Sequence, residues 1–339
     1  MTTVRVFIPR DSAAVAVGAD EVADALSAQA AARGLQVEIV RNGSRGMFWL
    51  EPLVEVETPQ GRVGYGPVTE DDVAGLLDAA VLQPDAPQSA SHPLSLGLME
   101  ALPWLARQER LTFARMGITD PLSTADYEAH GGIAGLRRAL SIDGPAIVQQ
   151  VLDAGLRGRG GAAFPAGIKW KTVAAAAADQ KYIVCNADEG DSGTYSDRMT
   201  MEGDPFMLIE GMTIAGIAAG ATLGYVYVRS EYPDAIATLS EAIVRANAAG
   251  WLGNDILGSG KTFVLEVRKA AGSYVCGEET AMLESLEGKR GIVRAKPPLP
   301  AIEGLFGKPT VINNVITFAS VPIILAKGAE FYRDYGVGR

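Results

Sequence analysis

The sequence predicts an α/β protein in which largely parallel strands are covered by helices. Two observations support this class: strand and helix patterns alternate along most of the chain, and glycine-rich or acidic turns follow the strands. Such alternation is typical of βαβ units, in which a helix carries the chain back across the sheet. With 339 residues, 48% of them hydrophobic, the chain is long enough for two or more cores.

The first eighty residues predict a small α/β unit. Its expected elements are the strand Val4–Ile8, the helix Asp20–Ala32, the strands Leu35–Val40 and Leu53–Val56, and a helix from Asp71. Thr69 can cap that last helix, and the acidic residues after it suit the positive end of the helix dipole. Residues 82–96, rich in proline, serine and alanine, are typical of a linker.

The remaining chain is helical and irregular up to Gly155 and then alternates strongly. A helix is expected over 145–152, ending at Gly155 as a natural C′ residue. The later elements are expected to be strand Tyr182–Cys185, helix Phe206–Ala218, strand Tyr225–Val228, helix Pro233–Ala249, strands Thr262–Val267 and Ser273–Val275, and helix Thr280–Leu286.

Composition and charge exclude several classes of protein. A net charge of −10 disfavours binding to nucleic acid, because an acidic surface repels phosphates. The most apolar stretch, 207–228, is interrupted by glycines and Glu210, which favours a buried helix and strand over a membrane span. Two cysteines are too few for a four-ligand metal site, and no secretory signal is visible, so a soluble cytoplasmic protein without direct membrane insertion is expected.

The loop Gly158–Phe164 superficially fits the dinucleotide-binding fingerprint. We reject the standard βα turn here, because that fingerprint needs a strand immediately before it and 145–155 predicts a helix. The glycines nevertheless let the backbone approach a flat ring or a phosphate, with Arg159 and Lys169 supplying positive charge. The alternative is an ordinary flexible surface loop.

Two acidic clusters are expected at strand ends, where ligands bind in open α/β sheets. Residues 186–193 directly follow the strand Tyr182–Cys185, and residues 272–280 join the expected strand Ser273–Val275 to a helix. An acidic turn and a set of helix-capping carboxylates are the alternatives that need no ligand. A fourth patch combines Lys296 on a proline-rich turn with adjacent amides at 313–314.

Four motifs resemble those of the NADH-binding flavoprotein (51 kDa-type) subunits of NADH dehydrogenases. They are Gly-Arg-Gly-Gly-x-x-Phe-Pro-x-Gly-x-Lys-Trp at 158–170, Asn-Ala-Asp-Glu-Gly-x-x-Gly-Thr at 186–194, Tyr-x-Cys-Gly-Glu-Glu-Thr-Ala at 274–281, and Gly-Lys-Pro-Thr-x-x-Asn-Asn-Val at 307–315. They occur in the family's order and spacing. The resemblance runs from about residue 155 to 317. Within the family, the segments 41–46 and 111–123 look most like the β (diaphorase) subunit of NAD-dependent molybdenum- or tungsten-containing formate dehydrogenases.

The resemblance implies an FMN pocket with a site for NAD(H) above it. FMN and pocket residues would be Gly158, Arg159, Gly160, Gly161, Lys169, Asn186, Asp188, Asp191, Tyr274, Gly277, Glu278, Asn313 and Asn314. Phe164 would stack on NAD(H), Glu189 and Glu279 would meet its polar parts, and Lys296 would lie near its phosphates. No side chain is expected to be catalytic and no metal to be bound, because hydride transfer belongs to the cofactors.

The resemblance also implies a domain organisation and partners. Residues 1–90 would form a thioredoxin-like domain similar to a [2Fe-2S] ferredoxin but lacking cluster cysteines, residues 91–150 a linker and helical segment, and residues 151–330 a Rossmann-like FMN- and NAD(H)-binding domain. Ubiquitin-like and [4Fe-4S] helical domains are expected beyond residue 339. Partners would be a [2Fe-2S] thioredoxin-like subunit and an iron–sulfur and molybdopterin catalytic subunit.

Three positions depart from the family pattern: Ala163 replaces a frequent glycine, and Thr172 and Leu299 replace aromatic residues that sandwich the adenine. Weaker or altered dinucleotide binding is therefore expected. Two alternatives remain open: the equivalent subunit of respiratory NADH:quinone oxidoreductase or of an NAD-reducing hydrogenase, and a non-catalytic scaffold subunit.

Overall fold

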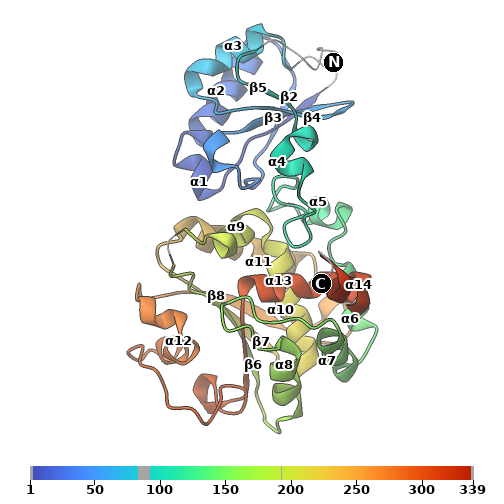
Figure 1. Cartoon of the computed structure of the whole chain (residues 1–339), viewed down its shortest axis with the longest axis vertical. Helices are drawn as coiled ribbons and strands as arrows, with labels where there is room; N and C mark the ends of the chain where they lie inside the picture. The colour runs from blue at the N-terminus through green and yellow to red at the C-terminus, as the bar shows by residue number, and fades with distance from the viewer. Residues whose placement is uncertain (1–2, 83–91, 192, 337–339) are drawn as a thin grey trace. The chain divides into compact units, whose positions relative to one another are not determined.

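The structure, a computed structural model, describes residues 3–82, 92–191 and 193–336. The chain divides into two compact units, 1–121 and 122–339 (Figure 1), so the boundary falls inside the segment 91–150 that the sequence sets apart. Most of the expected linker, residues 83–91, lies outside the described residues. Among the described residues, no helix is long and apolar enough to cross a membrane.

The described part of the first unit contains a five-stranded sheet and four α-helices, two of which are only four residues long. Its elements are β1 Val4–Phe7, α1 Ser12–Val15, α2 Ala19–Ala32, β2 Val37–Val40, β3 Val54–Thr58, β4 Gly61–Tyr65, α3 Val73–Asp78, β5 Ser95–Leu98 and α4 Pro103–Ala106. The strand order is β2-β1-β3-β4-β5, with β1 and β2 parallel and the remaining pairs antiparallel. This is the predicted thioredoxin-like arrangement, and its 121 residues contain no cysteine.

The core of the first unit lies between the sheet and helices α2 and α3. Alternate residues of β1 and β3, such as Val6 and Val56, are buried against Val22 and Leu26 of α2. The predicted elements of this unit are therefore confirmed within a few residues. Strands β4 and β5 were not predicted, because their glycines weaken the alternating apolar pattern, and β5 includes the last two residues of the expected linker.

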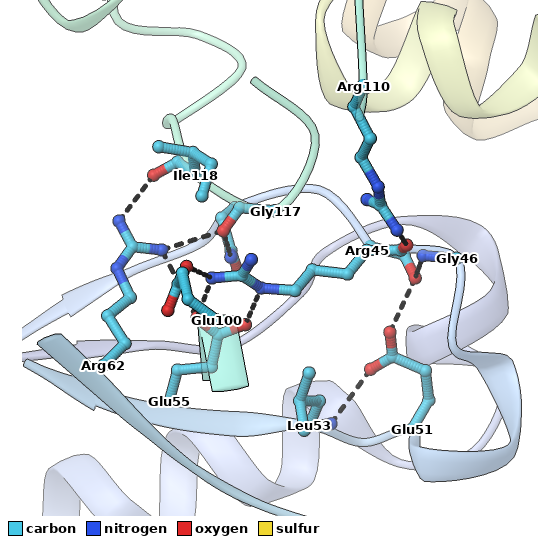
Figure 2. Close-up of polar contacts among 12 residues, drawn as sticks. Arg45, Gly46, Glu51, Leu53, Glu55, Arg62, Glu100, Arg110, Gly117 and Ile118 are labelled. Atoms are coloured by element: carbon cyan, nitrogen blue, oxygen red, sulfur yellow. Dashed lines mark hydrogen bonds and ion pairs between the residues drawn. The ribbon is translucent and has the colours of Figure 1, made fainter. Parts of the chain in front are cut away.

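A buried ion cluster fastens the last segment of the first unit to its sheet (Figure 2). The Arg45 guanidinium makes two hydrogen bonds to the Glu55 carboxylate, at 2.5 and 2.8 Å, and both side chains are almost fully buried. Arg62 donates to the carbonyl oxygens of Gly117 and Ile118 at 2.8 and 2.7 Å. The cluster thereby satisfies backbone acceptors in a segment without regular structure.

The second unit has a four-stranded, fully parallel sheet in the order β8-β7-β6-β9. Its strands are β6 Tyr182–Ala187, β7 Leu223–Val228, β8 Val264–Lys269 and β9 Thr310–Asn314. Its helices are α5 Thr124–Ala129, α6 Ala134–Leu140, α7 Gly144–Asp153, α8 Ala166–Ala175, α9 Ser196–Gly203, α10 Pro205–Ala219, α11 Pro233–Ala248, α12 Glu279–Leu286, α13 Val315–Lys327 and α14 Ala329–Asp334.

Helices cover both faces of this parallel sheet, as the Rossmann-like prediction requires (Figure 1). On one face, Ile183, Val226 and Val311 are buried in a large core shared with α10 and α13. On the other face, Val184 and Ile312 belong to a smaller core shared with α12. Consecutive strand residues point to opposite faces, so each strand contributes to both cores.

The expected strand Ser273–Val275 is wrong. Residues Tyr274–Gly277 form a 3-10 helix, η5, whose turn is closed by hydrogen bonds from the Cys276 N–H to Ser273 and from the Glu278 N–H to Val275. The apolar and aromatic residues that predicted a strand are instead largely exposed, with Tyr274 72% exposed. The elements β9, α8 and α13 are not predicted from the sequence either, because short apolar runs do not distinguish strand from helix.

Candidate functional site

The site lies where strands β6 and β9 end side by side. These strands are parallel neighbours, and Asn186 is the register partner of Asn314, while Cys185 is that of Asn313. The carboxyl ends of parallel strands meet at one edge of a sheet, which is where ligands bind in open α/β folds. Two motifs more than 110 residues apart in sequence, 186–194 and 307–315, are thus brought together.

Asn186 connects the end of β6 to η5. Its side-chain nitrogen donates to the Gly277 carbonyl at 2.8 Å, and its side-chain oxygen accepts from the Asp188 N–H at 3.2 Å. Burial raises the pKa of Asp188 to about 6, although nearby Arg229 acts against the rise. The Asp188 Oδ2 atom is buried and has no hydrogen-bond partner among the described residues. An unsatisfied buried oxygen of this kind suits a donor from a bound ligand.

The glycine-rich loop rests on Asn314 and on the first turn of α13. A Cβ atom added to Gly160 would lie 3.2 Å from the Asn314 Cβ, so this close approach favours glycine. Gly161 has a φ of +104°, a conformation that other residues rarely adopt. The Arg159 N–H donates to Thr317 Oγ1 at 2.9 Å. Helix α7 precedes the loop, which agrees with our rejection of the standard dinucleotide turn.

Helix α8 brings two consecutive side chains to the end of β9. Trp170 is fully buried, and its indole N–H donates to Asn313 Oδ1 at 2.9 Å. Lys169 donates to the Ile312 carbonyl at 3.3 Å and to Glu279 Oε2 at 3.4 Å. One helix therefore orients an amide and places a positive charge at the same strand end.

The carboxylates of the third motif are paired with lysines. Glu278 caps α12 by accepting from the Thr280 and Ala281 N–H groups at 2.8 and 2.9 Å. Lys296 Nζ lies 2.9 Å from Glu278 Oε1 and 2.8 Å from Glu279 Oε1. Burial acts to raise the pKa of Glu279, but Lys169 and Lys296 outweigh it and hold that pKa below its usual value. Both carboxylates are therefore charged at neutral pH.

The Glu189 carboxylate, another predicted site group, is bound by the start of helix α9. Its carboxylate is 7% exposed and accepts from the Asp197 and Arg198 N–H groups at 2.9 and 3.1 Å and from the Tyr232 hydroxyl at 3.2 Å. These bonds direct Glu189 at the start of α9. Its predicted contact with NAD(H) stays a prediction.

Other predicted residues are open to solvent. The Tyr274 hydroxyl donates to Asp191 Oδ1 at 2.8 Å, and the Tyr274 ring lies against Gly190, where an added Cβ would be 2.7 Å away. Phe164 is 47% exposed, and its ring centroid is 6.0 Å from Lys169 Nζ. Arg159 extends from the glycine loop toward α14, where it donates to the Tyr332 hydroxyl.

Three residues that support the site were not singled out from the sequence: Trp170, Asp197 and Thr317. Trp170 belongs to the first motif but has the character of an ordinary core residue. Asp197 and Thr317 follow the second and fourth motifs by a few residues, and their positions in the first turns of α9 and α13 are typical of capping residues. Only their short distance from a motif could have drawn attention to them.

Comparisons with known proteins place this geometry in a family. The Nuo51 FMN-binding domain matches residues 151–323, just over half of the chain. The chain is 50% identical over 232 residues to a subunit of the NADH-quinone oxidoreductase of Rhizobium meliloti (strain 1021), covering 68% of this chain and 55% of that protein. It is 49% identical over 230 residues to a subunit of the NADP-reducing hydrogenase of Solidesulfovibrio fructosivorans, covering 68% of this chain and 47% of that protein.

A solved structure extends the likeness to the first unit. A chain of an NAD+-reducing [NiFe]-hydrogenase in the H2-reduced state matches with a TM-score of 0.57 and 28% identity, covering 98% of this chain and 54% of that chain. The present chain spans about half the length of the relatives it matches. Its sequence motifs and strand-end geometry agree with these matches, and the chain belongs to the family of the Nuo51 FMN-binding domain.

Proposed function

We propose that the second unit binds FMN at the ends of β6 and β9 and exchanges hydride between this flavin and NAD(H). One observation carries this proposal: a glycine loop, three asparagine amides and an unsatisfied Asp188 oxygen lie together at one edge of the sheet. These groups fit a flavin, whose ring carbonyls, ring nitrogens and phosphate need donors, acceptors and close backbone approach. A bound flavin supplies the hydride and single-electron chemistry.

The chain's own residues position this group and its dinucleotide partner. The backbone of the glycine loop can approach the flavin or its phosphate, and Lys169 can neutralise charge beside it. The amides of Asn186, Asn313 and Asn314 are already oriented by fixed partners. For NAD(H) we propose that Phe164 provides an apolar stacking face and that Lys296 lies near the phosphates. Preorganised polar groups of this kind need little rearrangement when a ligand binds.

The test uses the full chain reconstituted with FMN. We expect visible flavin absorbance that stays with the protein on gel filtration, and reduction of ferricyanide by NADH. Asn186→Ala should weaken FMN binding about tenfold, which corresponds to about 1.4 kcal/mol and the loss of one or two hydrogen bonds. Asn254→Ala is the control, because that side chain is exposed. If the wild-type chain neither retains flavin nor oxidises NADH, the scaffold alternative is correct.

For the whole protein we propose the diaphorase subunit of an NAD-dependent formate dehydrogenase. This proposal is supported by the segments 41–46 and 111–123, whose amino-acid sequences resemble those of such subunits. Its partners would be a [2Fe-2S] thioredoxin-like subunit and an iron–sulfur and molybdopterin subunit. The names of the relatives favour the other complexes, an NADH-quinone oxidoreductase or a hydrogenase.

The native complex separates these proposals. It should be purified through a tag on this chain and assayed with NAD+ and formate, with NAD+ and H2, and with NADH and a quinone. Formate-dependent NAD+ reduction supports our proposal. Activity only with H2 or only with a quinone would replace it by the corresponding alternative.

A further inference from the structure

The side chain of Asn314 is held from two directions. Its oxygen accepts from the Ile316 N–H at 2.9 Å and so caps α13, and its nitrogen donates to Asp197 Oδ2 at 2.6 Å. These two contacts fix which end of the amide carries oxygen and which carries nitrogen. The second N–H of the amide has no acceptor among the described residues, and a Cβ atom added to Gly160 would lie 3.2 Å from the Asn314 Cβ.

Asp197 contacts Asn314 from a buried position in the first turn of α9. The residue is 5% exposed. Burial and the neighbouring carboxylate of Glu189 raise the pKa of Asp197 to about 8, while the hydrogen bond from Asn314 acts against that rise. The group is therefore mainly an uncharged carboxylic acid at neutral pH. An uncharged hydrogen-bonding partner can hold an amide without placing a negative charge beneath the loop.

The position of Asp197 is itself set by the end of β6. Glu189 Oε1 accepts from the Asp197 N–H at 2.9 Å, and Glu189 Oε2 accepts from the Arg198 N–H at 3.1 Å. Glu189 stands two residues after the last residue of β6, so the first turn of α9 is tied to the same strand end as Asn186. A continuous set of hydrogen bonds therefore runs from β6 through Glu189 and Asp197 to Asn314 on β9.

We propose that Asp197 is a positioning residue of the flavin site, which fixes the Asn314 amide beneath the glycine loop so that its free N–H is presented to the bound cofactor. This inference rests on the proposed binding of FMN. Asp197 lies outside the four motifs, and it would set the orientation of Asn314, which lies inside one of them. Glu189 then contributes to the site through Asp197.

The test compares two substitutions at one position in the full chain. Asp197→Leu removes the acceptor and keeps the branching at Cγ, and we expect FMN to bind about tenfold more weakly, as for the loss of one buried hydrogen bond. Asp197→Asn keeps an oxygen that can accept from Asn314 and is uncharged like the native acid, so its FMN affinity should stay within about threefold. Asp234→Leu, in the exposed first turn of α11, controls for loss of an acid at a helix start.

A double-mutant cycle distinguishes positioning from a general effect on folding. If Asp197 acts through Asn314, then Asp197→Leu should weaken FMN binding much less in an Asn314→Ala background than in the wild type. The unfolding midpoint of the flavin-free chain is measured for every variant. Equal FMN affinity of Asp197→Leu and the wild type would overturn the inference, as would fully additive losses in the cycle or a loss in Asp197→Asn equal to that in Asp197→Leu.

These measurements distinguish a failure of the proposed function from a failure of the positioning role. A wild-type chain that binds no FMN contradicts the proposed function itself. A wild-type chain that binds FMN, together with an Asp197→Leu variant that folds and binds it equally well, contradicts only the positioning role. If Asp197→Leu does not fold, Asp197→Ala takes its place in the comparison and in the cycle, with the same expected loss and the same outcome that contradicts the positioning role.

Discussion

The indole N–H of Trp170 donates to the side-chain oxygen of Asn313 across 143 residues of sequence, at 2.9 Å and in a fully buried position. This contact fixes the orientation of the Asn313 amide, since an oxygen bonded to the indole leaves the nitrogen directed away from it. The same helix brings Lys169 to the main-chain carbonyl of Ile312, the residue that precedes Asn313 in β9. The site is thus supported from the core side as well as from its loops.

Removing the indole N–H tests that support. Trp170→Phe should reduce the free energy of unfolding by about 1–3 kcal/mol, because the Asn313 oxygen loses its buried donor and a small cavity forms. FMN affinity should fall in the same variant, since the amide is no longer oriented. Urea unfolding and flavin titration measure the two effects. Trp104→Phe, at an exposed position, is the control, and an unchanged affinity in Trp170→Phe would contradict the orienting role.

Glu189 is expected to matter for stability. Glu189→Ala should lower the free energy of unfolding by at least about 2 kcal/mol, because the first turn of α9 loses a charged acceptor for two N–H groups. The substitution also removes the repulsion that raises the pKa of Asp197, so that pKa should decrease from about 8. Urea unfolding at several pH values measures both. Glu231→Ala, at a neighbouring exposed carboxylate, should leave both unchanged.

An aromatic residue at position 299 should strengthen dinucleotide binding. Leu299 is 55% exposed, and an aromatic contact contributes about 0.5–1.5 kcal/mol beyond its buried area. Leu299→Phe is therefore expected to lower the NADH KM severalfold with little change in kcat. Steady-state ferricyanide reduction measures this. Val244→Phe, on the exposed surface of α11, is the control, and an equal or higher KM in Leu299→Phe would refute the expectation.

The stability of the first unit should decrease as pH rises, because of Glu51 (Figure 2). Burial raises the pKa of Glu51 from 4.5 to about 8, and Asp11 and Glu55 add to the rise, while hydrogen bonds from Ser44 and the Leu53 N–H oppose it. The folded state therefore keeps a proton that the unfolded chain releases between these two values. By linkage, the free energy of unfolding falls from about pH 4.5 to about pH 8 and levels off above.

Glu51→Gln tests this dependence, because the amide can hydrogen-bond Ser44 and Leu53 without ionising. The fall in unfolding free energy between about pH 4.5 and 8 should become shallower in this variant. Asp188 and Asp197, whose pKa is also raised, belong to the second unit, so their titration affects the unfolding of that unit and not of the first. Glu57→Gln, at a half-exposed position, is the control and should retain the wild-type slope.

Strong periodicity made much of the fold predictable from the sequence. Helix α11 was recognised from its proline at the start, its apolar face and Gly250 after it, and α10 from an apolar stretch broken by glycine. The motif residues were recognised through their resemblance to a family. The prediction of a strand over 273–275 was wrong because the same apolar residues also fit a tight turn. The hydrogen bonds of that turn join residues three positions apart.

The sequence by itself determined the α/β class, the absence of cysteine from the first unit and the four motifs of the Nuo51 FMN-binding domain family. Tertiary structure alone decided that Asn186 and Asn314 are register partners, that Trp170 holds Asn313, and that Glu189 and Asp197 lead from β6 to Asn314. The physical reason is that periodicity and capping are local along the chain. Hydrogen bonds between residues more than a hundred positions apart depend on strand order and helix packing.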